Sequence, residues 1–413
     1  MKIELLHLNT NYHAMSEELA QPTTIEDEYE LWKSNVSLMY DFLSETRLLW
    51  PTLTVEWLPS LETENIRQEF IIGTLTTGAE KNFLKIAAID LPEEVIKDEC
   101  NNDNEKDDDT EAGSTHSKIK IVKKFAHEEE VNRARYMPQN TDLIATINGS
   151  GTVFLYDKSK NKQEALVSKF VAHTENGYGL SFNPNIKNQL LSCSDDKTVA
   201  LWDITNNKAP LHFIEPHVDM VNDCKWSNFN EALFGSVSED KHLYLYDTRC
   251  TKKNMIIGDI QAESSFNTLS FSKHSHNLFA AAGTDSLVYL YDMRNLSKPL
   301  HAMEGHTDSV STLDFSPHRD GIILSSGADR RVITWDITQF GAELPPEDAE
   351  DGVPELLMMH GGHRSSVNDF SINPNIPWLV ASAEEENILH IWKVSKRLTT
   401  TEFTAKYDIK SLE

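Results

Sequence analysis

Cysteine is scarce in this sequence and follows no pairing pattern. The 413 residues include four cysteines, Cys100, Cys193, Cys224 and Cys250, and no two of them form a Cys-x-x-Cys pair. Disulfide-stapled domains and structural zinc sites depend on clustered or regularly spaced cysteines. We therefore expect free thiols in a reducing compartment, which predicts a location in the cytoplasm and nucleus.

Long apolar runs are also missing. No stretch approaches the roughly 20 apolar residues that a membrane-spanning helix needs. The apolar core of the first segment, MKIELLHLNTNYHAM, is short and is broken by Glu4 and His7, which is not typical of a secretory signal. Residues 1–22 are interpreted as a flexible leader, and no membrane partner is expected.

Positive charge is in short supply. The chain has 38 Lys and Arg against 65 Asp and Glu, a formal net charge of −27. Residues 93–111 hold ten of the acidic residues, and residues 343–355 hold six with no basic residue. A protein that binds nucleic acid directly shows the opposite balance. A basic protein partner is the better match, although acidic charge can also serve solubility alone.

The short motifs of common enzyme classes are absent as well. The sequence has no Gly-rich phosphate loop, no nucleophile elbow and no His-Glu-x-x-His pattern. Its carboxylates are plentiful, but no pair stands in the apolar setting that acid–base catalysis requires. We expect no catalytic residue, no cofactor and no metal.

What the sequence does contain is a repeat. Residues 305–336, GHTDSVSTLDFSPHRDGIILSSGADRRVITWD, hold three short apolar runs separated by turn residues, which predicts three antiparallel strands. Asp329 follows His306 by 23 residues, and Trp335 follows Asp329 by six. The same register links His173, Asp196 and Trp202; His217, Asp240 and Tyr246; and, with drifted members, His127, Ser150 and Tyr156; Ala262, Asp285 and Tyr291; and His363, Glu386 and Trp392.

Six such units, together with a degenerate first unit that ends near Asp90, predict an all-β, seven-bladed WD40 propeller. In each blade, Asp, His, Ser and Trp are expected to form a buried chain of hydrogen bonds, with Ser325 or Ser326 as the serine of the quoted unit. Because the spacing assigns each histidine to a different blade, these histidines are interpreted as scaffold rather than metal ligands. The predicted network comprises His173, Asp196, Trp202, His217, Asp240, His306, Asp329, Trp335 and His363.

The remaining segments are assigned by their patterns. Residues 23–38 are predicted to form a helix that starts with a capping box of Thr23 and Glu26. The stripe that should pack on the propeller is Ile25, Tyr29, Trp32 and Val36. Leu31 lies off this stripe, as either a lone surface leucine or an anchor for a partner helix.

Within the predicted propeller, residues 39–395, we expect residues 39–50 to close the ring as the outer strand of the last blade. Residues 98–116 are interpreted as an acidic disordered loop. Residues 340–357 are interpreted as an ordered acidic insertion between the last two blades. The tail, residues 396–413, has a possible short helix.

Several stretches resemble one protein family: WPTLTVEWLP (50–59), NRARYMPQN (132–140), ENGYGLSF (175–182), GGHRSSVNDF (361–370) and SAEEENILHIW (382–392). They are similar to the histone-binding WD-repeat proteins, the retinoblastoma-binding-protein family of chromatin chaperone subunits, and most of all to fungal regulatory subunits of type B histone acetyltransferases. The resemblance covers about residues 24–395. It implies a non-catalytic subunit, one copy per complex, that captures histones H4 and H3 and presents H4 to an acetyltransferase catalytic subunit acting on newly made histones.

The resemblance also implies two binding surfaces. A groove between the N-terminal helix and the acidic insertion would take the first helix of histone H4, lined by Glu28, Leu31, Trp32, Asp348, Glu350, Asp351, Leu356, Met358 and Met359. The two methionines could equally be core residues. The top face would take the tail of histone H3 through Glu130, Asn132, Tyr178, Glu231, Glu385 and Asn387. Asn176 and Ser309 replace residues that are usually acidic in the family, which should weaken H3 binding.

Two other functions remain open at this point. A subunit of a chromatin-assembly or deacetylase complex would use the same histone groove. A substrate receptor of a cullin-type ubiquitin ligase would use Asp…Trp-Asp-x-Arg boxes, which the segments ending at Arg249 and Arg294 resemble with Tyr for Trp. These arginines could instead pair with the neighbouring blade.

Overall fold

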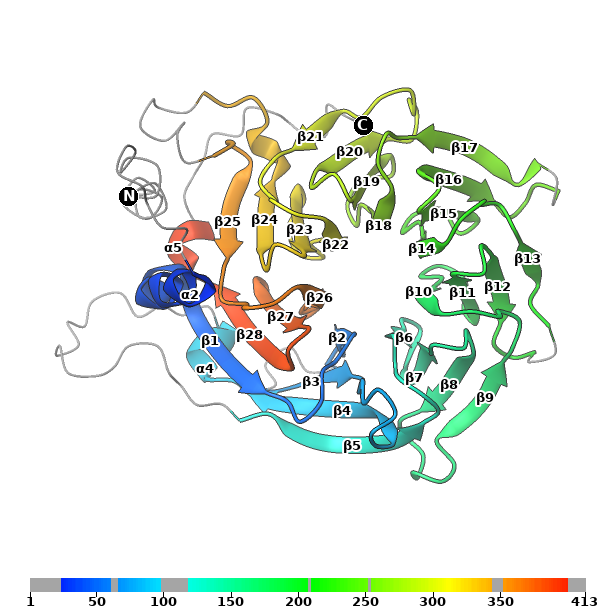
Figure 1. Cartoon of the computed structure of the whole chain (residues 1–413), viewed down its shortest axis with the longest axis horizontal. Coiled ribbons are helices and arrows are strands. Elements are labelled where there is room, and N and C mark those ends of the chain that lie inside the picture. Colours follow the sequence, from blue (N-terminus) through cyan, green and yellow to red (C-terminus); the bar gives the residue numbers. More distant parts are fainter. Residues whose placement is uncertain are drawn as a thin grey trace.

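The fold is a ring of seven β-sheets. The structure, a computed structural model, describes residues 24–60, 66–97, 118–206, 209–251, 254–343 and 352–399. Within these ranges, 28 strands form seven four-stranded sheets arranged around a central axis, which confirms the predicted propeller (Figure 1). The expectations for residues 1–22 and 98–116, and for Asp348, Glu350 and Asp351, concern positions outside the described residues.

Each blade runs from an innermost first strand to an outermost fourth strand. The first two blades are β2 (Val55–Trp57), β3 (Arg67–Ile72), β4 (Asn82–Asp90) and β5 (Lys120–His127), then β6 (Arg133–Met137), β7 (Asn140–Ile147), β8 (Val153–Asp157) and β9 (Leu166–Phe170). The third and fourth are β10 (Gly177–Phe182), β11 (Gln189–Ser194), β12 (Val199–Asp203) and β13 (His212–Ile214), then β14 (Val221–Trp226), β15 (Leu233–Ser238), β16 (His242–Asp247) and β17 (Ile256–Gln261).

The remaining blades continue in the same order. The fifth and sixth are β18 (Phe266–Phe271), β19 (Leu278–Gly283), β20 (Val288–Asp292) and β21 (His301–Met303), then β22 (Val310–Phe315), β23 (Ile322–Gly327), β24 (Val332–Asp336) and β25 (Leu356–His360). The seventh is β26 (Val367–Ile372), β27 (Leu379–Glu384), β28 (Ile388–Val394) and β1 (Tyr40–Arg47). We call the end of the ring where each fourth strand leads into the next blade the top face, and the opposite end the bottom face.

The N-terminal strand closes the ring. β1 pairs antiparallel with β28, from Tyr40 opposite Val394 to Arg47 opposite Ile388. Its side chains also join a core cluster shared by the first and last blades, in which Phe42 packs with Val55 and Leu379. The pairing covers what would otherwise be an open strand edge.

The core lies between blades rather than inside one sheet. All five residues of β24 are buried, whereas most residues of the outer strand β5 are exposed. The central strands are covered by neighbouring blades on both faces, so their sequences are nearly continuous apolar runs. One typical cluster joins Val288 and Met303 of the fifth blade to Ile333 and Trp335 of the sixth.

Chains of buried hydrogen bonds between side chains stabilise the individual blades. In the sixth blade, His306 Nδ1–H donates to Asp329 (2.8 Å), Ser325 Oγ–H donates to His306 Nε2 (2.7 Å), and Trp335 Nε1–H donates to Ser325 (2.8 Å). Ser325, and not Ser326, is therefore the serine of this chain. Equivalent chains contain His173 with Ser192 and Trp202, and His217 with Asp240 and Ser236.

Two of the drifted repeats differ from the spacing-based expectation. His363 Nδ1 donates to Glu384 (3.0 Å), 21 residues away, and not to Glu386. His127 contacts the carbonyl of Glu129 and the hydroxyl of Thr146, while Ser150 bonds within its own turn to Asn148. In the last blade the acceptor lies two residues earlier, at the end of β27, and in the second blade a backbone carbonyl beside the histidine replaces it, so a fixed interval no longer finds either one.

The acidic insertion lies within a blade, not between two blades as expected. It separates β24 from β25, the third and fourth strands of the sixth blade, after the short 3₁₀ turn η2 (Ile337–Gln339). Leu356 and Leu357, which we assigned to the insertion, belong to β25. The acidic segment 98–116 occupies the same connection in the first blade, between β4 and β5, after α4 (Glu93–Lys97).

The N-terminal helical segment is two helices, α2 (Ile25–Ser34) and α3 (Val36–Met39), rather than one. Thr24 and Asp27 form the capping box, one residue later than predicted, with Asp27 N–H donating to Thr24 Oγ1 (3.2 Å) and Thr24 N–H donating to Asp27 (3.0 Å). A single turn, α5 (Lys396–Thr399), follows the last blade. No helix in the described ranges is long and apolar enough to cross a bilayer.

Candidate functional site

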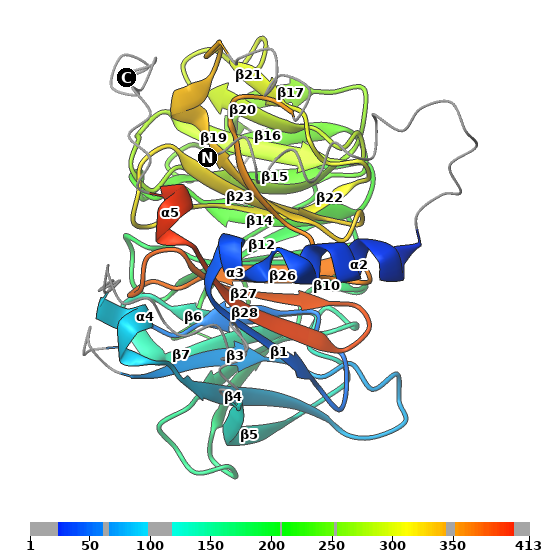
Figure 2. The ribbon, with the colours of Figure 1, turned by 90° about the vertical axis from the view of Figure 1, so that its left-hand side faces the viewer.

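α2 lies on the rim of the ring, where the sixth and seventh blades meet (Figures 1 and 2). It shares a core cluster with residues of β24, β25, β27 and β28. Its first turn carries Glu26, Asp27 and Glu28, which stabilise the positive end of the helix dipole. The helix therefore presents an acidic N-terminal turn beside the sixth blade.

Trp32 anchors α2 to the propeller. The side chain is buried, and its ring lies edge-on to Tyr40 and His360 and parallel to His390. The backbone at Gly362 passes so close that an added Cβ would lie 2.6 Å from two atoms of the indole ring. Trp32 is therefore a docking residue beneath the helix, and its expected role in lining a groove stays a prediction.

Arginines of the ring hold the N-terminal half of α2. Glu28 Oε2 accepts hydrogen bonds from Arg330 (3.0 Å) and Arg331 (2.9 Å), both in the turn before β24. The guanidinium of Arg364 lies 3.8 Å from the centre of the Tyr29 ring. Glu28 thus binds the propeller itself, which the sequence could not indicate because its partners lie 302 and 303 residues away.

The outward face of α2 differs from the predicted stripe. Tyr29 and Trp32 are buried, but Ile25, the first residue of the stripe, is exposed. Leu31 is half-buried rather than fully exposed. The carboxylates of Glu26, Asp27 and Glu30 face solvent, so an acidic surface borders the apolar part of the helix.

β25 supplies the apolar residues next to the helix. Met358 is buried in the same cluster as Tyr29 and Trp32, so it is a core residue. Leu356 and Met359 are half-buried against the fifth and sixth blades, and Leu357 is half-buried on the side of α2. Leu357 was missed because a bulge opposite Trp335 interrupts the strand alternation there.

The top face carries a second group of expected residues. Glu130, Glu385 and Asn387 lie in connections at this end of the ring, and Tyr178 lies at the start of β10, where a bulge interrupts the pairing with β11. Tyr178 is 38% exposed, and burial together with the charges of Asp195 and Glu130 raises its pKa. Asp195, which the sequence reasoning missed, lies next to Asn176 and accepts a hydrogen bond from its side chain. Its carboxylate supplies negative charge beside the position where Asn176 lacks it.

Other members of that set are placed differently. Glu231 lies in the connection between β14 and β15, on the bottom face, and its carbonyl accepts from Asn183. Asn132 is 5% exposed, and its amide donates to the carbonyl of Gly177 in the next blade (3.0 Å). Asn387 donates to the carbonyl of Leu48 (2.9 Å). Glu231 is therefore excluded from the top face, and Asn132 joins neighbouring blades instead of facing solvent.

Comparison with known proteins places the chain in a family. A family model described as histone-binding protein RBBP4 or a CAF1-complex component matches residues 27–93, and the WD40 repeat model matches residues 164–203, 208–247, 297–336 and 354–393. Histone acetyltransferase type B subunit 2 of Kluyveromyces lactis is 56% identical over 409 residues, which cover 96% of this chain and 99% of the relative. This chain belongs to the histone acetyltransferase type B subunit 2 family.

Other members of the type B subunit 2 family are similar over the same length. The Candida glabrata protein of that name is 52% identical over 97% of this chain and 96% of its own. The Candida albicans protein is 44% identical over 97% of this chain and its full length. The histone-binding family model begins inside α2 and ends at the start of α4, so it covers the helix, the closing strand and most of the first blade.

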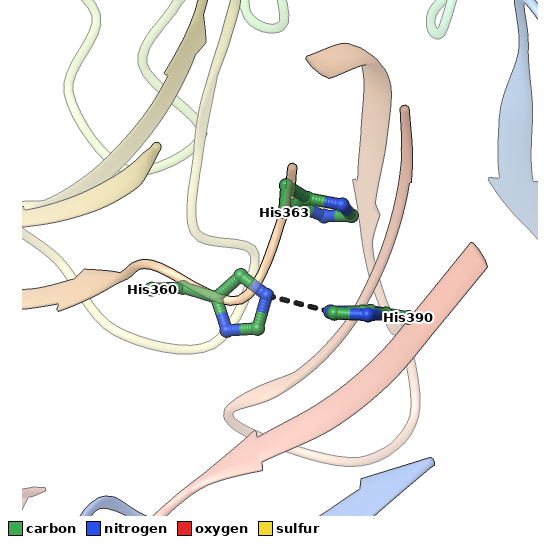
Figure 3. Close-up of side chains that lie close together, drawn as sticks. All are labelled: His360, His363 and His390. Carbon is green, nitrogen blue, oxygen red and sulfur yellow. Dashed lines mark hydrogen bonds between the residues drawn. The ribbon is translucent and has the colours of Figure 1, made fainter. Parts of the chain in front are cut away.

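Three buried histidines meet below α2 in this family member: His360, His363 and His390 (Figure 3). Their ring nitrogens are close enough to raise the question of a metal site. The rings of His363 and His390 are stacked, however, with centroids 4.4 Å apart and planes 20° apart. Lone pairs that lie in parallel ring planes do not converge on one ion, and both nitrogens of His363 already bond to Glu384 and Ser382. The geometry favours a hydrogen-bonded cluster.

The arginines of the two Tyr-Asp-x-Arg boxes fold back onto their own turns. Arg249 binds Asp247 through Nε (2.9 Å), and Arg294 binds Asp292 through Nη2 (2.7 Å). The expected pairing of Arg249 with a neighbouring blade is wrong, because the side chain folds back on Asp247 in its own turn. Both guanidinium groups remain largely solvent-exposed.

The bottom end of the channel contains a cavity of about 220 Å³. Arg135, Lys225 and Lys273 line it together with Glu56 and Asp314. Lys273 pairs with Asp314 (2.7 Å), and burial raises the pKa of Glu56 to about 7. Arg135 and Lys225 pair with Asp369 (3.2 Å) and Asp223 (3.5 Å), so each of the three cations that line the cavity already has a carboxylate partner.

Proposed function

We propose that this chain is a non-catalytic, histone-binding subunit of a type B histone acetyltransferase complex. The observation that carries the proposal is the end-to-end similarity to proteins named histone acetyltransferase type B subunit 2, combined with a histone-binding family model that matches α2 and the blade beside it. The acetyl transfer and its cofactor then belong to another chain, the catalytic subunit. An association with histones implies presence in the nucleus, and we infer a cytoplasmic location in addition.

Within this function, we infer that the first helix of histone H4 binds beside α2. An amphipathic basic helix needs an apolar surface bordered by carboxylates. The described residues offer both, with Leu31 and Leu357 next to Glu26, Asp27 and Glu30. The acidic residues Asp348, Glu350 and Asp351 follow β24 in the sequence, and we infer that they complete the border. The net charge of −27 would attract such a partner over long range.

We also infer that the top face binds the unmodified tail of histone H3. Glu130, Asp195 and Glu385 supply negative charge there, and Tyr178 supplies an exposed aromatic ring. Exposed ion pairs contribute only about 0.2–1 kcal/mol each. A basic tail would therefore bind through several modest contacts, and the loss of acidic residues at Asn176 and Ser309 would weaken it without abolishing it.

The decisive experiment measures binding of a fluorescent peptide of the first H4 helix. The wild type is compared with a variant in which Asp348, Glu350 and Asp351 are all changed to Ala. A matched control replaces the exposed acids Glu164, Glu215 and Glu263, which lie on other blades, and removes the same charge. We expect the first variant to lose at least tenfold in affinity and the control to lose little. Equal losses of affinity in the two variants would show that net charge alone accounts for the effect, and would contradict binding of H4 in the proposed groove.

A chromatin-assembly subunit is the second candidate. The matching family model names the CAF1 complex beside RBBP4, so the same histone-binding elements occur in both settings. Mass spectrometry of proteins that co-purify with the tagged chain distinguishes them. An acetyltransferase as the stoichiometric partner supports the type B complex, and assembly-factor subunits in its place would support the alternative.

A further inference from the structure

A line of buried hydrogen bonds runs from α2 into the ring. Trp32 Nε1 lies 3.0 Å from the Tyr40 hydroxyl, which lies 2.6 Å from His360 Nδ1. His360 Nε2 lies 3.0 Å from His390 Nδ1 (Figure 3). The four side chains come from α2, β1, β25 and β28, so the line joins the helix to both blades beneath it.

The line returns to α2 at its far end. His390 Nε2 lies 3.5 Å from Glu45 Oε2, on β1. The same carboxylate oxygen accepts a hydrogen bond from the hydroxyl of Tyr29 (2.8 Å). Tyr29 and Trp32 are the two buried residues of α2, so both of its anchoring side chains end on this network.

The chemistry of the Trp32 end fixes the direction of each proton, because an indole N–H can only donate. At the other end, the contact between His390 Nε2 and Glu45 Oε2 is 3.5 Å long and is not a hydrogen bond. The Tyr40 hydroxyl therefore accepts from Trp32 and donates to His360 Nδ1, and His360 donates through Nε2–H to His390 Nδ1. His390 in turn carries its proton on Nε2, facing Glu45. This arrangement requires both histidines to be neutral.

We propose that the sequence Trp32–Tyr40–His360–His390 is a proton-sensitive relay that positions α2 for histone binding. The positioning of the helix is independent of the ligand, whereas its consequence for histones rests on the proposed function. A proton added to His390 would place an N–H against the N–H of His360. A proton added to His360 would remove the acceptor of the Tyr40 hydroxyl.

The surroundings of the relay favour the neutral forms. Burial lowers the pKa of His360 well below its usual value, and the nearby His363, His390 and Arg331 lower it further. Burial lowers the pKa of His363 to about 4. The charged and titratable groups that face the relay are Glu28 and Tyr29 on α2, Glu45 on β1, Arg331 before β24, His363 and Arg364 after β25, and Glu384 on β27.

The direction of the pH effect follows from these lowered pKa values. A histidine that must stay neutral in the docked state stabilises docking fully above its ordinary pKa of about 6.5, and this stability falls as the pH drops below that value. Once His360 becomes accessible on undocking, a fall from pH 7.5 to pH 5.5 should raise the undocked population about tenfold.

His217 and His306, which stand at the repeat position in two other blades, do not share this property. His217 and His306 each donate to an aspartate and accept from a serine within their own blade. His360 has no carboxylate partner among the described residues, since Tyr40 and His390 occupy its two nitrogens. The relay is therefore a feature of this corner of the ring rather than of the repeat.

The test is hydrogen–deuterium exchange of the full chain, reading the amides of α2 between pH 5.5 and 7.5 after correction for intrinsic rates. Tyr40→Phe breaks the relay without changing the shape of the side chain. We expect at least tenfold faster exchange in α2, unchanged exchange in β14–β16, and weaker binding of the H4 peptide. Tyr156→Phe is the control, because that buried hydroxyl bonds only to the carbonyl of Ala126 in the described contacts.

A second pair of variants separates the role of the hydrogen-bond acceptor at position 390 from that of the imidazole ring. His390→Asn keeps an acceptor near the Nδ1 position and removes the titratable group, whereas His390→Leu removes both. We expect the Asn variant to keep α2 protected with a flatter pH dependence, and the Leu variant to lose protection at every pH. Unchanged exchange in Tyr40→Phe, or no pH dependence in the wild type, overturns the relay. Faster exchange with unchanged H4 affinity upholds the relay as the anchor of α2 and overturns the proposed groove instead.

Discussion

The carboxylate of Asp369, in the seventh blade, binds the guanidinium of Arg135, in the second blade, across the first blade. Arg135 Nη1 and Nη2 lie 3.2 and 3.3 Å from its two oxygens. Asp369 is fully buried and also accepts from Arg133 (3.1 Å) and from the backbone N–H of Val55 (3.0 Å). One side chain thus joins three blades at the point where the first and last blades close the ring.

We expect Asp369→Asn to destabilise the whole ring. Burial raises the pKa of Asp369, but Arg135 and Arg133 outweigh it and hold the pKa below its usual value, so the native state depends on the ionised form. Removing one partner of a buried ion pair costs about 3–5 kcal/mol. Urea denaturation measures the loss. The control is Asp142→Asn, whose half-exposed pair with Lys158 should contribute less than about 1 kcal/mol.

Ser325→Ala should cost more than Ser326→Ala, although both side chains are fully buried. Ser325 accepts from Trp335 and donates to His306, so its loss leaves two buried groups without a partner. Ser326 Oγ makes a single side-chain contact, of 3.4 Å, with Ser311. At about 1–3 kcal/mol for each of the two unsatisfied groups, Ser325→Ala should lower the free energy of unfolding by about 2–6 kcal/mol. Equal thermal shifts in the two variants would contradict the proposed chain.

Gly362→Ala should displace α2 while the propeller stays folded. The added Cβ would lie 2.6 Å from the Trp32 ring, and both lie in closely packed surroundings. We expect a loss of at least tenfold in H4-peptide affinity with little change in the far-ultraviolet circular dichroism. Leu38→Ala, an exposed position on α3, serves as the control and should bind like the wild type.

Asp195→Asn should weaken binding of an H3-tail peptide modestly, by up to about fivefold, because exposed charge pairs contribute about 0.2–1 kcal/mol. Asn176→Asp should strengthen it by a similar factor. Glu231→Gln, on the bottom face, should change nothing. Fluorescence polarisation at low and physiological salt checks the series, since the effect should shrink with screening. A loss in Glu231→Gln equal to that in Asp195→Asn would move the site away from the top face.

The site was less accessible to sequence reasoning than the fold. Tyr29 and Trp32 could be placed on the buried face of α2 because helical periodicity is local. Glu28 was assigned to the histone groove, and its pairing with Arg330 and Arg331 could not be predicted, because these partners lie 302 and 303 residues further along the chain. The placement of Glu231 failed for a related reason: an acidic residue in a loop carries no sign of which end of the ring that loop joins.

The sequence by itself determined the propeller. The recurring intervals from histidine to aspartate to tryptophan specify strand, turn and buried hydrogen-bond chain within each unit, and a blade that cannot bury its faces alone must stack on its neighbours. Only the tertiary structure decided that His360 meets His390, that Asp369 reaches Arg135, and that Asp195 lies beside Asn176. The first two contacts join residues of different blades, so the packing of blades into a ring, and no local pattern, brings them together. Asn176 and Asp195 lie 19 residues apart in one blade, at a spacing that also links Met220 to Glu239 and Ser366 to Glu385, but only the folded blade shows that the two side chains bond.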